Sequence, residues 1–138
     1  MRCFMAVGKP DICTSPTRIW FWSAFEPARL SKKASKLLIS RAESIAFSMA
    51  TLWEVAIKTS LVKPGFSVDV LRLHGALLAE GFSELDIRAS HLARLASLPW
   101  IHRDPFDRLL VAQAMEEGLT LLTADAALKG YGRFVRVV

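Results

Sequence analysis

The chain has 138 residues, of which 52% are hydrophobic and 22% charged, with a formal net charge of +5. This length suits one domain with a single core, and this composition excludes an intrinsically disordered chain. No apolar run approaches the roughly 20 residues that a membrane-spanning helix needs, and the N-terminal residues lack the pattern of a secretory signal. We therefore expect a cytoplasmic protein in which Cys3 and Cys13 are reduced thiols.

The expected elements alternate between helices and strands along the chain. They are a helix over 26–40, a strand over 44–48, helices over 49–61 and 67–81, a strand over 83–87, a helix over 89–98 that stops at Pro99, a helix over 104–118, a buried strand over 119–125, a short helix through Leu128 and a closing strand over 134–138. Pro105 stands in the first turn of the helix 104–118, and Gly118 supplies its C-terminal stop. This alternation predicts an α/β fold with a mostly parallel sheet.

Acidic side chains fall at three junctions between an expected strand and the following helix. Glu54 is placed in the first turn of the helix after the strand 44–48, Asp107 in the first turn of the helix 104–118 with Asp104 as its cap, and Asp125 directly after the buried strand. In α/β folds such loops gather at one edge of the sheet and form sites there. Clustered carboxylates suit a hard cation such as Mg²⁺ or Mn²⁺, which can activate water.

Each of these acids also has a purely structural interpretation. Thr51 and Glu54 have the spacing of a capping box. Asp104 is a good N-cap, and Asp107 complements the dipole of the same helix. Asp125 can cap the short helix that follows it. Both interpretations stay open at the level of the sequence.

Several neighbouring side chains have two interpretations as well. Arg103 and Arg108 flank the acids and could bind phosphate or form salt bridges. His102 could transfer a proton or make a structural hydrogen bond at the helix entry. Trp53, like Trp20 and Trp22, fits a core or interface better than base stacking.

Two blocks, "SMATLWEVAIKTSL" and "LPWIHRDPFDRLLVAQAMEEGLTLLTAD", resemble the PIN-domain ribonuclease toxins of the VapC type. The resemblance runs from about Ile19 to Val138. It implies a three-layer α/β/α fold, clustered acids that bind Mg²⁺ or Mn²⁺ to cut RNA, and an antitoxin whose C-terminal segment covers the site. Carried over by position, three acids match the metal site of the family, Asp104 matches the additional aspartate of the Asp-Pro-Phe-Asp motif, and Thr123 matches a hydroxyl residue beside the last acid. The three matched acids are Glu54, Asp107 and Asp125.

The chain departs from the family at the first acid. The family opens with a strand that ends in Asp-Thr-His or similar, whereas Pro16, Thr17 and Arg18 stand at these positions here. A proline cannot bind a metal, and it removes a backbone donor from a strand. Either the first 18 or so residues are altered, for instance by a shifted reading frame, which would cripple the enzyme, or Asp11 replaces the missing acid.

Positive charge is concentrated at the start of the chain. Residues 1–41 hold eight Lys or Arg against two Asp or Glu, whereas residues 42–138 hold ten against eleven. A basic segment of this kind suits RNA or an acidic protein segment, and a solvated helix face is the plain alternative.

The sequence therefore predicts a single PIN-like domain over residues 1–138 that acts as a metal-dependent endoribonuclease toxin. We expect an antitoxin, RNA and a second copy of the chain as partners, with helices in 19–40 and 51–61 offering an apolar strip. The alternative is a catalytically impaired protein that binds antitoxin or RNA without cleaving, because Pro16 replaces the first acid. A basic RNA-binding domain without metal chemistry would leave three acids unexplained.

Overall fold

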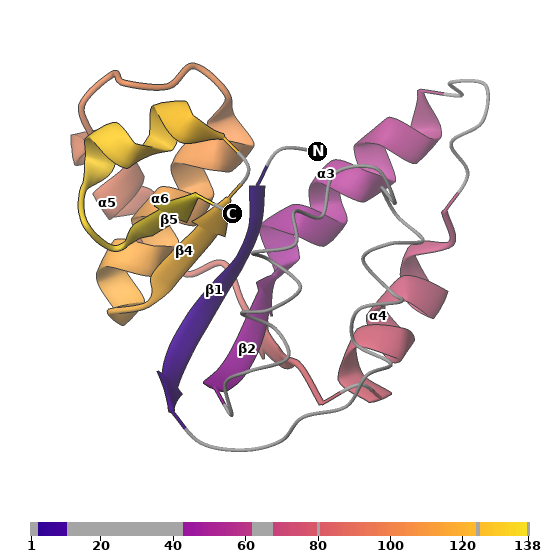
Figure 1. Ribbon diagram of the computed structural model, residues 1–138. Coiled ribbons are helices and arrows are strands. Elements are labelled where there is room, and N and C mark those ends of the chain that lie inside the picture. The colour runs from indigo at the N-terminus through magenta and orange to yellow at the C-terminus, as the bar shows by residue number, and fades with distance from the viewer. Residues whose placement is uncertain (1–2, 11–42, 62–67, 80, 124, 138) are drawn as a thin grey trace.

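The computed structural model describes residues 3–10, 43–61, 68–79, 81–123 and 125–137 (Figure 1). The described elements, in chain order, are β1 (Cys3–Pro10), β2 (Glu43–Ser48), α3 (Met49–Ser60), α4 (Val70–Ala79), β3 (Ser83–Leu85), α5 (Ala89–Ser97), α6 (Pro105–Glu117), β4 (Thr120–Thr123), the 3-10 helix η1 (Ala126–Tyr131) and β5 (Val135–Val137). The expected helix 26–40 lies outside the described residues, as do Asp11 and Pro16.

The five strands form one sheet in the order β3-β2-β1-β4-β5. β2 is parallel to β3 and β4 is parallel to β5, whereas the central β1 is antiparallel to both β2 and β4. In Figure 1 the indigo β1 separates β2 from the pair β4 and β5. Four strands therefore share one direction, and the prediction of an α/β fold with a mostly parallel sheet is confirmed.

The sequence patterns did not predict β1. The first strand expected from the residues themselves is 44–48, and the first strand of the family ends at the position of Thr17 and Arg18, whereas the structure has a strand over Cys3–Pro10. Its run "CFMAVG" is continuously apolar, which is typical of a strand in the middle of a sheet covered on both faces. Its central place follows from its backbone pairing with a strand on each side, at Ala6 with both Ala46 and Leu121.

Helices cover both faces of the sheet. Ile45 and Phe47 of β2 pack into a core with side chains of α3 and α4, among them Leu52 and Leu73. Ser48 follows Phe47 and therefore points to the opposite face, where its hydroxyl contacts Gln113 of α6 at 2.5 Å. The chain thus has the three layers expected of it.

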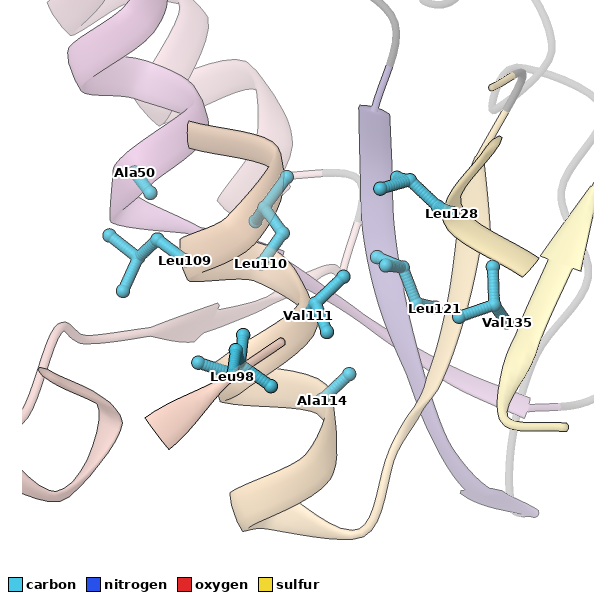
Figure 2. Packing of buried hydrophobic residues seen from close by; sticks show 10 residues of the cluster. Ala50, Leu98, Leu109, Leu110, Val111, Ala114, Leu121, Leu128 and Val135 are labelled. Atoms are coloured by element: carbon cyan, nitrogen blue, oxygen red, sulfur yellow. The ribbon is translucent and has the colours of Figure 1, made fainter. Parts of the chain in front are cut away.

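A second core joins α5 and α6 to β4, β5 and η1. Figure 2 shows its side chains converging from α6 on one side and from the strands and η1 on the other. The buried members are Ala50, Leu98, Leu109, Leu110, Val111, Ala112, Ala114, Leu121, Leu128 and Val135. Burial of each large aliphatic side chain contributes roughly 1.5–3 kcal/mol, so this core holds the N-terminus of α6 rigidly beside the end of β4.

Local sequence signals set the ends of α6 as expected. The Asp104 side chain caps the helix, Pro105 occupies its first turn, and Gly118 ends it with a left-handed backbone, φ 64°. Glycine suits that position because it lacks the Cβ that makes positive φ costly.

The start of α3 differs from the expected capping box. Ser48 is the N-cap, and its hydroxyl accepts a hydrogen bond from Ala50 N at 3.0 Å. Thr51 and Glu54 therefore lie inside the helix, so the capping-box interpretation of Glu54 is wrong, and so is its expected place in the first turn. Glu54 is left without a capping role, which makes its burial harder to explain by helix stability alone.

No helix within the described ranges combines the length and the apolar character needed to cross a membrane.

Candidate functional site

Asp104 and Asp107 enter the site from the first turn of α6. Asp104 Oδ1 accepts hydrogen bonds from the backbone N–H groups of Phe106 at 2.9 Å and Asp107 at 3.4 Å, so its capping role is confirmed. Asp107 is only 4% exposed. A negative charge in the first turn of a helix is stabilised by the positive end of the helix dipole, and Asp107 occupies such a position.

Asp125 enters the site from the end of β4. Its Oδ1 accepts a hydrogen bond from Ala127 N at 2.9 Å and caps η1, as one interpretation of the sequence expected. Its own backbone N–H donates to the buried hydroxyl of Thr123 at 2.9 Å. Thr123, which the resemblance places beside the last acid, therefore orients Asp125 from within the core.

His102 connects the two carboxylates. Its Nε2 lies 3.1 Å from Asp125 Oδ2, and its Nδ1 lies 3.3 Å from Asp107 Oδ2. Nδ1 also accepts a hydrogen bond from Asp104 N at 3.2 Å. A neutral ring with an accepting Nδ1 carries its hydrogen on Nε2 and donates it to Asp125.

The donor set of His102, Asp107 and Asp125 fits a divalent cation. One ligand atom from each residue lies within 4.8 Å of the other two. Two ligand atoms on one Mg²⁺, each about 2.1 Å from the ion, are at most about 4.2 Å apart. Small side-chain movements would therefore let the two carboxylates share one ion, and carboxylates are the protein ligands that suit Mg²⁺ and Mn²⁺.

Glu54 is buried nearby but does not belong to that group. It is 8% exposed, and Lys58 donates a hydrogen bond to its Oε1 at 2.6 Å. The pKa of Lys58 is raised: burial lowers it, but the hydrogen bond and charge of Glu54, together with the charge of Asp104, raise it more. Trp53, next to Glu54, packs edge-on against Phe106 of α6 with ring centroids 5.0 Å apart. α3 and the first turn of α6 are thus in direct contact beside the acids.

The two flanking arginines have different environments. Arg103 is exposed. Arg108 is 6% exposed, and its guanidinium donates hydrogen bonds to backbone oxygens at the end of α5 and in the following loop. The acceptors are Leu95 O, Leu98 O and Pro99 O, at 2.9–3.4 Å, and the Tyr131 hydroxyl lies at 3.2 Å. The sequence led us to expect that Arg108 binds phosphate or an acidic side chain. The structure instead has both terminal nitrogens of Arg108 hydrogen-bonded within the fold.

The sequence indicated neither the central place of His102 nor the part that Tyr131 plays. Tyr131 Oη accepts the backbone N–H of His102 at 3.1 Å and donates to Pro99 O at 3.1 Å. His91, to which the sequence assigned no role, is fully buried and contacts Glu117 at 2.8 Å, which joins α5 to α6. The only local sign for His102 is its place two residues before the capping Asp104.

Comparison with known proteins identifies the family of the chain. Residues 17–133 match the family described as PIN domain. Over 116 residues the chain is 31% identical to a protein named Ribonuclease VapC22 from Mycobacterium tuberculosis strain H37Rv, with 83% of this chain and 88% of that protein covered. No solved structure shows significant similarity to the chain. The family match spans most of the chain and contains every described residue of the site, so this chain belongs to the PIN-domain family.

Proposed function

We propose that this protein is a metal-dependent endoribonuclease and the toxin of a toxin–antitoxin pair. The observation that carries the proposal is the approach of Asp107 and Asp125 to within 4.8 Å of one another and of His102. Family membership and the similarity to Ribonuclease VapC22 support an RNA substrate and an antitoxin partner. We further propose a single domain, a homodimer and a cytoplasmic location, as the family resemblance implies.

The geometry supports the following roles. Asp107 and Asp125 would hold Mg²⁺ or Mn²⁺, and His102 would orient Asp125 through the hydrogen on its Nε2. When bound, such a cation would supply a Lewis acid for the hydrolysis of an RNA phosphodiester, with water as the nucleophile.

Glu54 would serve as a further acid of the same site. Its burial without a capping role, and the contact of Trp53 with Phe106, support this assignment. Lys58 supplies the positive charge that a buried carboxylate requires. Asp104 would act at the rim, since one of its oxygens is used by the helix cap.

For RNA we propose contacts from Arg103, with Thr123 supporting Asp125 from within the core. Arg103 is exposed and can reach RNA, whereas Thr123 is fully buried and can act only through Asp125. Arg108 has no place in this proposal, since its guanidinium is engaged within the fold.

The second candidate function is binding of antitoxin or RNA without efficient cleavage. Its support is Pro16, which stands where the family has its first acid. Mg²⁺ gives up its hydration shell reluctantly, so one carboxylate fewer weakens its retention.

A cleavage assay separates the two functions. Purified full-length protein is incubated with single-stranded RNA and Mg²⁺, Mn²⁺ or EDTA, beside an Asp107→Asn variant. Metal-dependent cleavage that the variant lacks supports the nuclease. Cleavage that survives both EDTA and Asp107→Asn overturns the metal site. RNA or antitoxin binding without any cleavage supports the second candidate.

A further inference from the structure

Trp100 is the most exposed large hydrophobic residue in the described segment between α5 and α6, which leads into the candidate site. It is 81% exposed and stands two residues before His102. Leu71 of α4 is equally exposed, but it belongs to the helix layer on the other side of the sheet (Figure 1). Scattered exposed apolar residues are common and need no explanation. What distinguishes Trp100 is the structure beneath it.

A fixed cation supports one face of the indole. The Arg108 guanidinium carbon lies 4.2 Å from the centre of the Trp100 ring. This arginine is 6% exposed, and backbone oxygens of the α5–α6 connection hold its planar group in place. Because Trp100 is so exposed, its opposite face lies toward solvent. The indole is therefore presented on a rigid support, and little conformational entropy is lost when something stacks on it.

Arg108, which supports the indole, is also linked through hydrogen bonds to His102. Tyr131 Oη accepts a hydrogen bond from Arg108 at 3.2 Å and another from His102 N at 3.1 Å. The network thus joins the residue beneath the indole to the backbone of the histidine that contacts Asp107 and Asp125. A group stacked on Trp100 would lie at a defined position relative to the carboxylates.

Exposed positive charge accompanies the indole. Arg103 follows Trp100 by three residues and is exposed. η1 packs against Ile101, the residue that follows Trp100, because a Cβ added at Gly130 would lie 3.0 Å from Ile101 Cγ2. Lys129, which precedes Gly130 in η1, is exposed. An aromatic face beside cations is the combination with which proteins bind single-stranded nucleic acid, since bases stack while phosphates meet positive charge.

We propose that Trp100 is a stacking platform for one nucleobase of a single-stranded RNA, held by Arg108 and placed beside the carboxylates. The inference rests on the proposed ribonuclease function and deepens it. The ring accepts any base, because every base has a π face, and it positions the strand rather than reading its sequence.

The test uses full-length protein carrying Asp107→Asn, which removes cleavage without touching the platform. Binding of a single-stranded RNA of roughly 12 nucleotides is measured by fluorescence anisotropy for the parent, Trp100→Ala, Trp100→Phe and the matched control Leu71→Ala. We expect about a tenfold loss of affinity for Trp100→Ala, substantial retention for Trp100→Phe, and no change for Leu71→Ala.

A second probe isolates stacking from charge. On a strand of the same length with all bases removed, the parent and Trp100→Ala should bind equally well, because only phosphate contacts remain. The salt dependence of RNA binding should be unchanged by Trp100→Ala and reduced by Arg103→Ala.

Three results of the binding experiments would overturn the platform. These are equal RNA affinity of Trp100→Ala and Leu71→Ala, an equal loss on the base-free strand, and intact RNA binding with loss of binding to the antitoxin alone. The last would make Trp100 part of a protein interface. In protein with Asp107 intact, cleavage with an unchanged KM for Trp100→Ala would refute the platform and leave the ribonuclease proposal standing. Stacking of RNA on Trp100 without any metal-dependent cleavage would refute the ribonuclease proposal and leave the platform standing.

Discussion

His102 Nε2 lies 3.1 Å from Asp125 Oδ2, and this contact joins the segment that enters α6 to the segment that leaves β4. The other oxygen of Asp125 accepts the N–H of Ala127, so the carboxylate is held on both sides. Groups that support a metal ligand in this way fix its orientation. These two contacts therefore hold Asp125 in place at the candidate site.

Asp125→Asn should weaken metal binding while preserving the fold. The amide oxygen can still accept the N–H of Ala127, but the negative charge that holds the cation is lost. We expect at least about a tenfold loss of Mn²⁺ affinity, measured by titration calorimetry. Asp86→Asn, at an exposed acid outside the site, is the control and should bind Mn²⁺ as the parent does. Equal affinity of both variants would exclude Asp125 as a ligand.

Lys58→Met should destabilise the protein in a pH-dependent way. Folding raises the pKa of Lys58 above 10.5, because Glu54 and Asp104 outweigh the effect of burial. The stabilisation by protonated Lys58 is fully present below pH 10.5, and it is lost as the pH rises through the pKa that Lys58 has in the folded protein. The side chain is 34% exposed, so we expect a decrease of about 0.5–1 kcal/mol in the free energy of unfolding at pH 7.

Urea denaturation between pH 7 and 11 would measure this difference, which should shrink above pH 10.5. Lys129→Met replaces an exposed lysine and should leave stability nearly unchanged. A gap between parent and Lys58→Met that widens at alkaline pH would contradict the assigned sign.

The two arginines beside the acids should separate stability from RNA binding. Arg108→Lys cannot reproduce the planar set of hydrogen bonds to Leu98 O, Pro99 O and the Tyr131 hydroxyl, and we expect it to cost about 1.5–3 kcal/mol of stability. Arg103→Ala should leave the melting temperature unchanged and reduce the salt slope of single-stranded RNA binding by about 0.7. The reverse pattern in thermal melts and binding titrations would restore Arg108 as the phosphate contact.

Pro16→Asp should partly restore RNA cleavage. It returns a carboxylate to the position of the first acid of the family and permits a backbone N–H there. We expect the cleavage rate with Mg²⁺ to rise by about tenfold or more. The cleavage rate should not rise in Pro16→Ala, which removes the proline without adding charge. Full family-like activity in the unmodified protein would instead show that Asp11 or another acid already completes the site.

Sequence patterns alone predicted the features that depend on neighbours within one helical turn. The cap at Asp104, the turn at Pro105 and the stop at Gly118 all occur as expected. They were predictable because a cap is satisfied by backbone groups two or three residues away. The alternation of strands and helices likewise indicated the α/β fold, and the acids at strand ends indicated where a site should lie.

Tertiary structure decided the features that depend on partners far along the chain. The residue that caps α3 is Ser48 rather than Thr51, and the hydroxyl of Ser48 also contacts Gln113, 65 positions away. His102 reaches Asp125 across 23 positions, and Arg108 meets carbonyl oxygens that only the docking of α5 brings together. Periodicity and capping rules contain no information about such distances. Whether a polar side chain serves a helix, a core or a catalytic group is therefore settled only when packing chooses its neighbours.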